Sequence, residues 1–256
     1  MNRYVHEMFP VEVCIDASSR LAAQRSAVAA FRAGAARVEV CSDMSVDGLT
    51  PPPASIAEVR RVFGRHPGVL VMIRPRPGDF AYSRAEQALM RRDIEMAATA
   101  GADGVVFGAL SPADRRIELS AVRRFVQIAK DSGVRTVFHR AFDAVPDRRE
   151  ALELLVDCGV GSLLTAGIPW GSAGSALDGL ETLEEIVRMA SGRIEVVIGG
   201  GIRSSNVKVI VSRIRSCGGP TAIHSYSGVL TKGKTSLPKV RELVSLVSEA
   251  LREQSS

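Results

Sequence analysis

The chain has 256 residues, of which 46% are hydrophobic and 24% are charged. These proportions are typical of a folded globular protein, and they exclude disordered, collagen-like and coiled-coil proteins. The formal net charge is +5, but the basic residues are spread along the sequence, so charge indicates no nucleic-acid partner. Aromatic residues make up only 5%, which leaves few rings on which the bases of a single strand could stack.

We expect neither a membrane segment nor a secretion signal. Charged residues or glycine interrupt every apolar run before it reaches the roughly 18 residues that a transmembrane helix needs. Residues 1–10 carry charges where a signal peptide would be apolar. The cysteines are far apart in a chain long enough to be stabilised by burial, so no disulfide framework is predicted. These observations favour the reducing cytoplasm.

Short apolar segments rich in β-branched residues recur along the chain, and each is typical of a buried strand. They are VEVCID (11–16), RVEVCS (37–42), VLVMIR (69–74), GVVFGA (104–109), RTVFHR (135–140), GSLLTA (161–166), IEVVIG (194–199) and TAIHSY (221–226). Segments with helical periodicity lie between them, at residues 22–33, 84–100, 120–130, 148–156, 180–189 and 237–251. This alternation predicts parallel strands connected by crossover helices.

Eight strand-and-helix units of about 32 residues each match the (β/α)8 or TIM barrel. A doubly wound sheet is the alternative, but Asp16-Ala17-Ser18-Ser19 follows the first strand instead of a glycine-rich fingerprint. No nucleotide cofactor is therefore expected. The prediction is a single α/β domain, a TIM barrel over residues 1–256, with an N-terminal arm at 1–10 and a frayed tail at 252–256.

The first two strands both contain Glu-Val-Cys, which places Glu12 and Cys14, and then Glu39 and Cys41, on one face of each strand. A carboxylate fits the barrel lumen better than the packed helices, so we expect all four side chains inside. The two glutamates can be catalytic, or they can form a buried ion network with Arg74. The two cysteines can be inert packing residues or metal ligands.

The third predicted strand leads into an arginine-rich exit. Arg74 and Arg76 alternate with prolines, and Asp79 follows. The fixed fork of a guanidinium group suits a carboxylate or a phosphate. We therefore predict an anion clamp there.

Charged and titratable residues also end the fifth strand, where His139, Arg140 and Asp143 follow one another closely. TIM-barrel active sites form at the carboxyl ends of the strands, and an imidazole beside a carboxylate can perform acid–base catalysis. His139 and Asp143 are therefore candidate catalytic residues, and Arg140 is a candidate substrate ligand.

After the seventh strand come Gly199, Gly200 and Gly201, whose backbone N–H groups could bind an anion. His224 and Ser225 end the eighth strand. TIM barrels frequently bind phosphate between these two loops. For His224, a ligand in the lumen and a core histidine are both open.

Several motifs occur in the order seen in CutC-like proteins, which the chain resembles over about residues 11–230. They are the two Glu-Val-Cys strands, Asp47-Gly48-Leu49-Thr50-Pro51, Arg74-Pro75-Arg76-Pro77-Gly78-Asp79-Phe80, Phe138-His139-Arg140-Ala141-Phe142-Asp143, Leu164-Thr165-Ala166-Gly167 and Gly199-Gly200-Gly201-Ile202. The resemblance implies a cytoplasmic TIM barrel named for copper homeostasis, with Cu(I) at Cys14 and Cys41. A thioether from Met72 would suit Cu(I) as well. Ala166 and Tyr226 depart from the family pattern, and Tyr226 could narrow the mouth.

Two functions therefore stay open. One is a copper homeostasis protein that binds Cu(I). The other is an isomerase or lyase type of enzyme that acts on a small anionic, phosphorylated, sugar-like substrate, with Glu12 or Glu39 as general base and His139 as its acid–base partner. A symmetric homodimer is expected, because related barrels pair and this is the commonest soluble oligomer.

Overall fold

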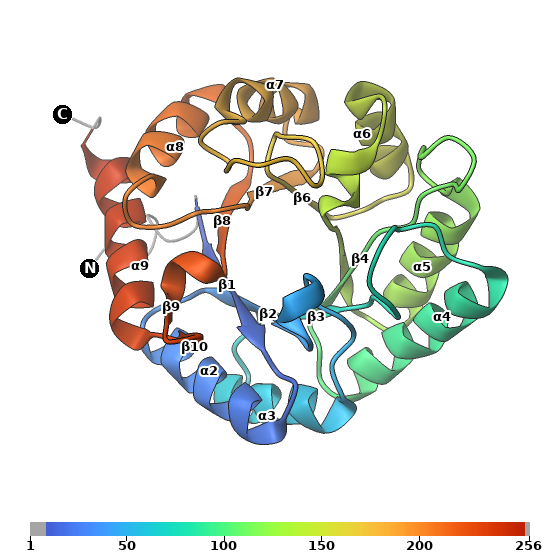
Figure 1. The fold of residues 1–256 in the computed structure, drawn as a ribbon, viewed down its shortest axis with the longest axis horizontal. Coiled ribbons are helices and arrows are strands. Elements are labelled where there is room, and N and C mark those ends of the chain that lie inside the picture. Colours follow the sequence, from blue (N-terminus) through green and yellow to red (C-terminus); the bar gives the residue numbers. More distant parts are fainter. Residues whose placement is uncertain (1–8, 254–256) are drawn as a thin grey trace.

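Parallel strands close into an eight-stranded barrel in the computed structural model, which describes residues 9–253 (Figure 1). Each strand pairs with the next in the chain, and β1 also pairs with β8. The strands are β1 (Val11–Asp16), β2 (Arg37–Cys41), β3 (Val69–Met72), β4 (Gly104–Phe107), β5 (Arg135–Phe138), β6 (Ser162–Thr165), β7 (Glu195–Ile198) and β8 (Thr221–Ser225). The predicted TIM barrel is confirmed.

A ring of helices covers the outside of the barrel (Figure 1). It comprises α2 (Arg20–Arg32), α3 (Pro53–Phe63), α4 (Arg84–Thr99), α5 (Leu119–Asp131), α6 (Arg148–Asp157), α7 (Leu180–Ala190), α8 (Val207–Ile214) and α9 (Leu237–Arg252). The helix α9 contacts both α8 and α2 and so closes the ring. No helix in the described part of the chain is long and apolar enough to cross a membrane.

The segments with helical periodicity did not include α3 and α8, although the eight strand-and-helix units implied a helix at each place. A proline starts α3 at a position that needs no N–H donor, so the run of prolines before it favours this helix start. The helix α8 is only eight residues long, too short to show helical periodicity clearly. A small hairpin of β9 (Leu230–Thr231) and β10 (Lys234–Thr235) was also not predicted.

The ends of the chain depart in part from the predicted arm and tail. Residues 1–8 and 254–256 lie outside the described residues. Phe9 is buried in the core, and the carbonyl of Pro10 accepts a hydrogen bond from Ile223 N–H. The arm therefore does not include these two residues, which pack on the barrel. The helix α9 continues to Arg252, where we had expected fraying.

The apolar interior has two parts because every strand buries both faces. The outward faces pack against the helices in one large core. The inward faces form a smaller cluster in the lumen, which consists of Cys14, Cys41, Leu70, Met72, Val106, Val137, Leu164, Val197 and Ala222. Both cysteines thus lie in the lumen, as the alternation of their strands predicted.

An ionic layer lies below this cluster, toward the amino ends of the strands. The guanidinium of Arg37 lies 3.2 Å from a carboxylate oxygen of Glu12 and 2.9 Å from one of Glu195. Ser162 also donates to Glu195, over 2.7 Å. Glu12 and Arg37 are register partners on β1 and β2. The network that Glu12 forms therefore contains Arg37 in place of the expected Arg74.

Candidate functional site

A cavity of about 240 Å³ lies at the carboxyl ends of the strands. Its lining comprises Cys14, Glu39, Met44, Asp47, Met72, Arg74, Phe80, His139, Arg140, Leu164, Trp170, Gly200, Gly201, His224, Tyr226 and Ser227. These residues come from strands and from the loops that follow them, as expected for a TIM barrel. The site therefore combines chain segments more than 200 residues apart.

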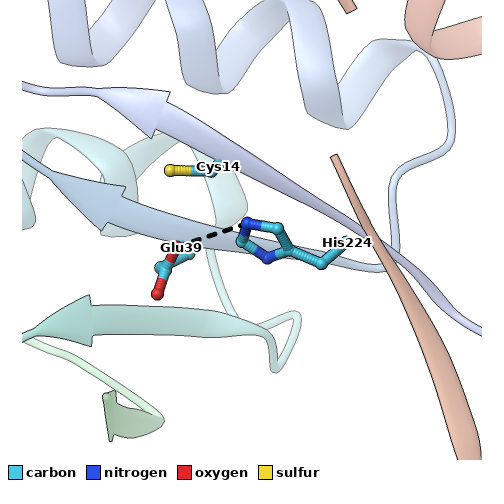
Figure 2. A group of neighbouring side chains, drawn as sticks. All are labelled: Cys14, Glu39 and His224. Carbon is cyan, nitrogen blue, oxygen red and sulfur yellow. Dashed lines mark ion pairs between the residues drawn. The ribbon is translucent and has the colours of Figure 1, made fainter. Parts of the chain in front are cut away.

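One side of the cavity brings together Cys14, Glu39 and His224 from three neighbouring strands. Their possible ligand atoms all lie within 4.8 Å of one another. Register explains the group, because Cys14 faces Glu39 across β1 and β2, while His224 is the β8 partner of Glu12. Figure 2 shows the Glu39 carboxylate and the His224 ring facing each other, with Cys14 on the adjacent strand. These residues could hold a metal ion.

Sulfur atoms gather on the same side. The Sγ atom of Cys14 lies 3.7 Å from Sγ of Cys41 and 3.8 Å from Sδ of Met44, and Met72 lines the cavity nearby. Met44 belongs to the 3-10 helix η1 (Met44–Val46) that follows β2. Its loop approaches closely, because a Cβ at Gly48 would lie 3.1 Å from Sγ of Cys41. Both cysteines are free thiols.

The charges around His224 favour its protonated form. Burial lowers its pKa, but contacts with Cys14 and Glu12 and the charge of Glu39 raise it well above the usual value. The Nδ1 atom lies 2.8 Å from Oε1 of Glu12, and Nε2 lies 3.6 Å from Oε2 of Glu39. Burial raises the pKa of Glu39, whereas for Glu12 the charges of Arg37 and His224 outweigh burial and lower it.

Both lumen cysteines favour the protonated thiol. The hydrogen bond with Cys41, together with burial, raises the pKa of Cys14 well above the usual value. The hydrogen bond with Cys14 lowers the pKa of Cys41, but burial and the neighbouring Glu39 raise it to about 11. A metal ion that binds thiolates would have to displace these protons.

On another part of the lining, His139 is buried and neutral. Its Nδ1 atom accepts a hydrogen bond from the backbone N–H of Ala141, over 3.1 Å. Burial and the charge of Arg74 lower the pKa of His139 to about 3. An imidazole with this pKa is neutral at neutral pH, with one ring nitrogen protonated, and the acid–base role of His139 stays a prediction. Gly108 leaves room for the ring, because a Cβ there would lie 2.4 Å from Cε1 of His139.

The structure separates the two arginines of the predicted anion clamp. Arg74 lines the cavity, and its Nη atoms donate to the carbonyls of Val46, Gly48 and Gly78. It lies beyond the end of β3 at Met72, because the prolines that follow cannot donate to a strand ladder.

Arg76 turns away from the cavity lining. It pairs with Glu86 over 2.5 Å and with the exposed Asp79 over 2.9 Å. Neither Arg76 nor Asp79 is part of the lining of this cavity. The structure therefore brings only one member of the predicted clamp, Arg74, to the site.

Arg140 lines the cavity, and the Asp143 carboxylate, which does not line it, holds the Arg140 guanidinium in place. The Asp143 carboxylate accepts from Nε of Arg140 over 2.7 Å, from Oγ1 of Thr165 over 2.5 Å and from the backbone N–H of Ala166 over 3.0 Å. The guanidinium of Arg140 lies 5.1 Å from the centre of the Trp170 ring. With its oxygens occupied, Asp143 supports the site without lining it.

The remaining predicted residues also separate into two groups. Gly200 and Gly201 line the cavity. The N–H of Gly199 donates to the Thr165 carbonyl and so continues the sheet, and Ser225 donates to the Ile202 carbonyl. Tyr226 lies on the lining, and its narrowing of the mouth stays a prediction. Glu12 lies in the ionic layer below the cavity.

Sequence reasoning missed several residues around the site. Arg37 and Glu195 begin strands that were read for their apolar positions, although a charge at the start of a buried strand is itself a signal of pairing. Met44 lies in the short helix η1, and Asp47 and Trp170 lie in loops, where no periodicity marks a side chain that lines the cavity.

Comparisons with known proteins agree with this architecture. The pattern of the CutC family matches residues 9–228. A family protein CutC of Rhizobium meliloti is 40% identical over 216 residues, which cover 84% of this chain and 80% of that protein. The copper homeostasis protein cutC homolog of Homo sapiens is 41% identical over 216 residues, which cover 84% of this chain and 72% of that one.

Solved structures show the same fold. The crystal structure of CutC from Streptococcus agalactiae has a TM-score of 0.73 and 28% identity, and the match covers 86% of this chain and 99% of that one. A 3-keto-L-gulonate-6-phosphate decarboxylase from Vibrio cholerae has a TM-score of 0.61, 13% identity and coverage of 94% and 98%. At that identity the likeness concerns the barrel alone.

Proposed function

Because the chain belongs to the CutC family, we propose that it acts in copper homeostasis by binding Cu(I) on the sulfur-rich side of its barrel cavity. The observation that carries this proposal is the position of Cys14. Its sulfur lies within 4 Å of the sulfurs of Cys41 and Met44, and within the ligand group that includes Glu39 and His224. The name of the human relative supports the same function.

The donor set suits Cu(I) better than a hard cation. Thiolate and thioether sulfurs are soft ligands that select Cu(I), whereas Mg²⁺ and Ca²⁺ prefer several oxygen atoms. Cys14, Cys41 and Met44 offer three such sulfurs from β1, β2 and the loop after β2. We propose that Cys14 and Cys41 are the principal ligands, that Met44 or Met72 completes the set, and that the reducing cytoplasm keeps both metal and thiols reduced.

The test is an anaerobic Cu(I) titration of the reduced protein against a competing chelator. We expect saturable binding that is lost in the double variant Cys14→Ser, Cys41→Ser. The matched control is Cys158→Ser, Cys217→Ser, which removes the two cysteines outside the lumen and should bind as the parent does. Failure of the parent protein to bind, or unchanged binding by the lumen variant, would contradict the proposal.

A second candidate function is catalysis on a small anionic substrate in the same cavity. It is favoured by the arginines Arg74 and Arg140 on the lining, together with the carboxylate of Glu39, whose pKa is raised by burial. An isomerase or lyase type of reaction on a phosphorylated, sugar-like compound stays a prediction, as does the homodimer. Turnover that is lost in Glu39→Gln while the melting temperature is kept would support this function, and absence of turnover with every anionic metabolite would contradict it.

A further inference from the structure

The side chain of His139 holds a hydrogen-bond donor that finds no acceptor within the described part of the chain. Its Nδ1 atom accepts from Ala141 N–H, so a neutral ring must carry its proton on Nε2. The residue is 4% exposed, and Nε2 is buried without a hydrogen-bond partner among residues 9–253. Buried polar groups are almost always paired, so an unpaired donor in a residue that lines a cavity is a candidate contact for a bound ligand.

Arg74 presents the same feature on the same lining. Its Nη atoms are engaged by loop carbonyls, which fix the plane of the guanidinium. The Nε atom is buried and has no partner in the described part of the protein, and the residue is 2% exposed. The guanidinium also lies near the buried Tyr82 hydroxyl and the Phe80 ring, but no carboxylate among residues 9–253 pairs with it, and an anion in the cavity would supply a counter-charge.

The ring of Phe80 lies beside both of these donors. It lies 5.4 Å from the Arg74 guanidinium and its centre lies 4.9 Å from that of His139. The ring of Trp170 packs edge-on against Phe80, with 5.1 Å between the ring centres. The guanidinium of Arg140 lies over the Trp170 ring. The aromatic pair therefore forms an apolar support beside the three donors, and Arg74 joins it to the segment that carries Met44 through the carbonyls of Val46 and Gly48.

We propose that Arg74 and His139 form a two-donor site for an anionic oxygen of a small ligand, of the carboxylate or phosphate class. The proposal deepens the second candidate function and does not depend on copper. A guanidinium supplies charge and a neutral imidazole supplies a directed N–H, and together they can hold a carboxylate or polarise a carbonyl oxygen. His139 thus acts as a fixed donor to the ligand, while the role of proton carrier falls to another group.

The experiment measures binding directly in the reduced, copper-free protein. Pyruvate, acetate and inorganic phosphate are titrated separately by calorimetry, and the Nε2–H signal of His139 is followed by NMR in a ¹⁵N-histidine sample. We expect saturable binding in the carboxylate arm or the phosphate arm, with a shift of that signal. The arm that binds identifies the ligand class.

Variants decide whether the two donors carry the binding. We expect His139→Ala and Arg74→Lys each to weaken it about 10- to 100-fold, as loss of a hydrogen bond to a charged group predicts. His139→Gln, which keeps an N–H donor, should retain binding within about threefold. The matched control Arg76→Lys should bind as the parent does, because Arg76 lies outside the lining. Melting curves of every variant show whether the barrel stays folded.

Two results would overturn the proposal. One is the absence of binding by all three probes, and the other is unchanged affinity in a folded His139→Ala. The variant Cys14→Ser, Cys41→Ser separates this site from the copper proposal, since it should lose Cu(I) and still bind the anion. Loss of anion binding in that variant would contradict a separate donor site, whatever the copper result.

Discussion

His139 and His224 are both buried in one barrel, yet His139 is neutral and His224 is positively charged. The pKa of His139 is lowered to about 3 and that of His224 is raised well above its usual value. Burial acts on both in the same direction, so it does not explain the difference. The neighbours do, because His139 receives a backbone N–H and faces Arg74, while His224 lies between the carboxylates of Glu12 and Glu39.

The two histidines show how the lumen is organised. The ring of His224 joins the ionic layer of Glu12 and Arg37 to the possible metal ligands above it. The ring of His139 packs against Phe80 as one of the hydrogen-bond donors beside that ring. Charges that must stay paired thus lie deep in the barrel, and the donors without a partner among residues 9–253 belong to residues that line the cavity.

The largest expected effect comes from removing the negative charge next to His224. Glu12→Gln leaves Arg37 and His224 without their shared carboxylate, and breaking a buried pair costs about 3–5 kcal/mol. Denaturant unfolding measures this loss, and an NMR titration should show a lower pKa for His224. As a control, Glu153→Gln breaks the exposed pair with Arg193 and should change stability by about 1 kcal/mol or less. Similar losses of stability in the two variants would show that burial does not make the ion pairs of the ionic layer stronger than an exposed pair.

The next largest loss of stability is expected when the space beside the His139 ring is filled. In Gly108→Ala the new Cβ would meet the His139 ring and lie 2.7 Å from Cβ of Ala141. We expect a loss of about 1–3 kcal/mol from overpacking, together with a displaced ring and weaker anion binding. Gly161→Ala, whose Cβ would come no closer than 3.2 Å to a backbone oxygen, is the matched comparison. Calorimetric melting and the anion titration provide the readouts, and normal affinity in Gly108→Ala would mean that the ring position is unimportant.

The lowered pKa of His139 also predicts how stability depends on pH. The unfolded histidine binds a proton below about pH 6.5, whereas the folded one stays neutral down to about pH 3. Protons therefore favour the unfolded chain, and the contribution of His139 falls by about 2 kcal/mol between pH 8 and pH 5. His224 has the opposite sign, so the effect is isolated by comparing the parent with His139→Gln. Parallel stability curves for the two proteins would show that His139 titrates normally.

The smallest effect is expected at Arg76, which the sequence analysis placed with Arg74 in the predicted anion clamp. Its ion pairs with Glu86 and Asp79 are partly exposed, so Arg76→Ala should cost about 1 kcal/mol or less. Anion affinity should stay unchanged. Chemical denaturation and the same calorimetric titration check both statements, and a marked loss of affinity would restore Arg76 to the clamp.

Much of the candidate site was visible in the sequence because of strand alternation. Glu-Val-Cys occurs twice, and each copy placed its cysteine in the lumen. Arg74, His139 and Arg140 stand out because charged residues are unusual at the ends of buried strands, and all three reach the cavity. Arg76 did not follow, because the chain leaves β3 at Met72 and alternation no longer describes it.

The sequence alone determined the eight strands, the barrel and the lumen position of the two cysteines, because these follow from a local period of two and a repeated unit length. Tertiary structure decided which charges meet. Register placed Arg37 beside Glu12 and His224 between two carboxylates, and loop packing brought Met44 to Cys14 and placed His139 on the lining of a cavity. Such contacts join residues distant in the chain, and a local pattern carries no information about distances across a closed barrel.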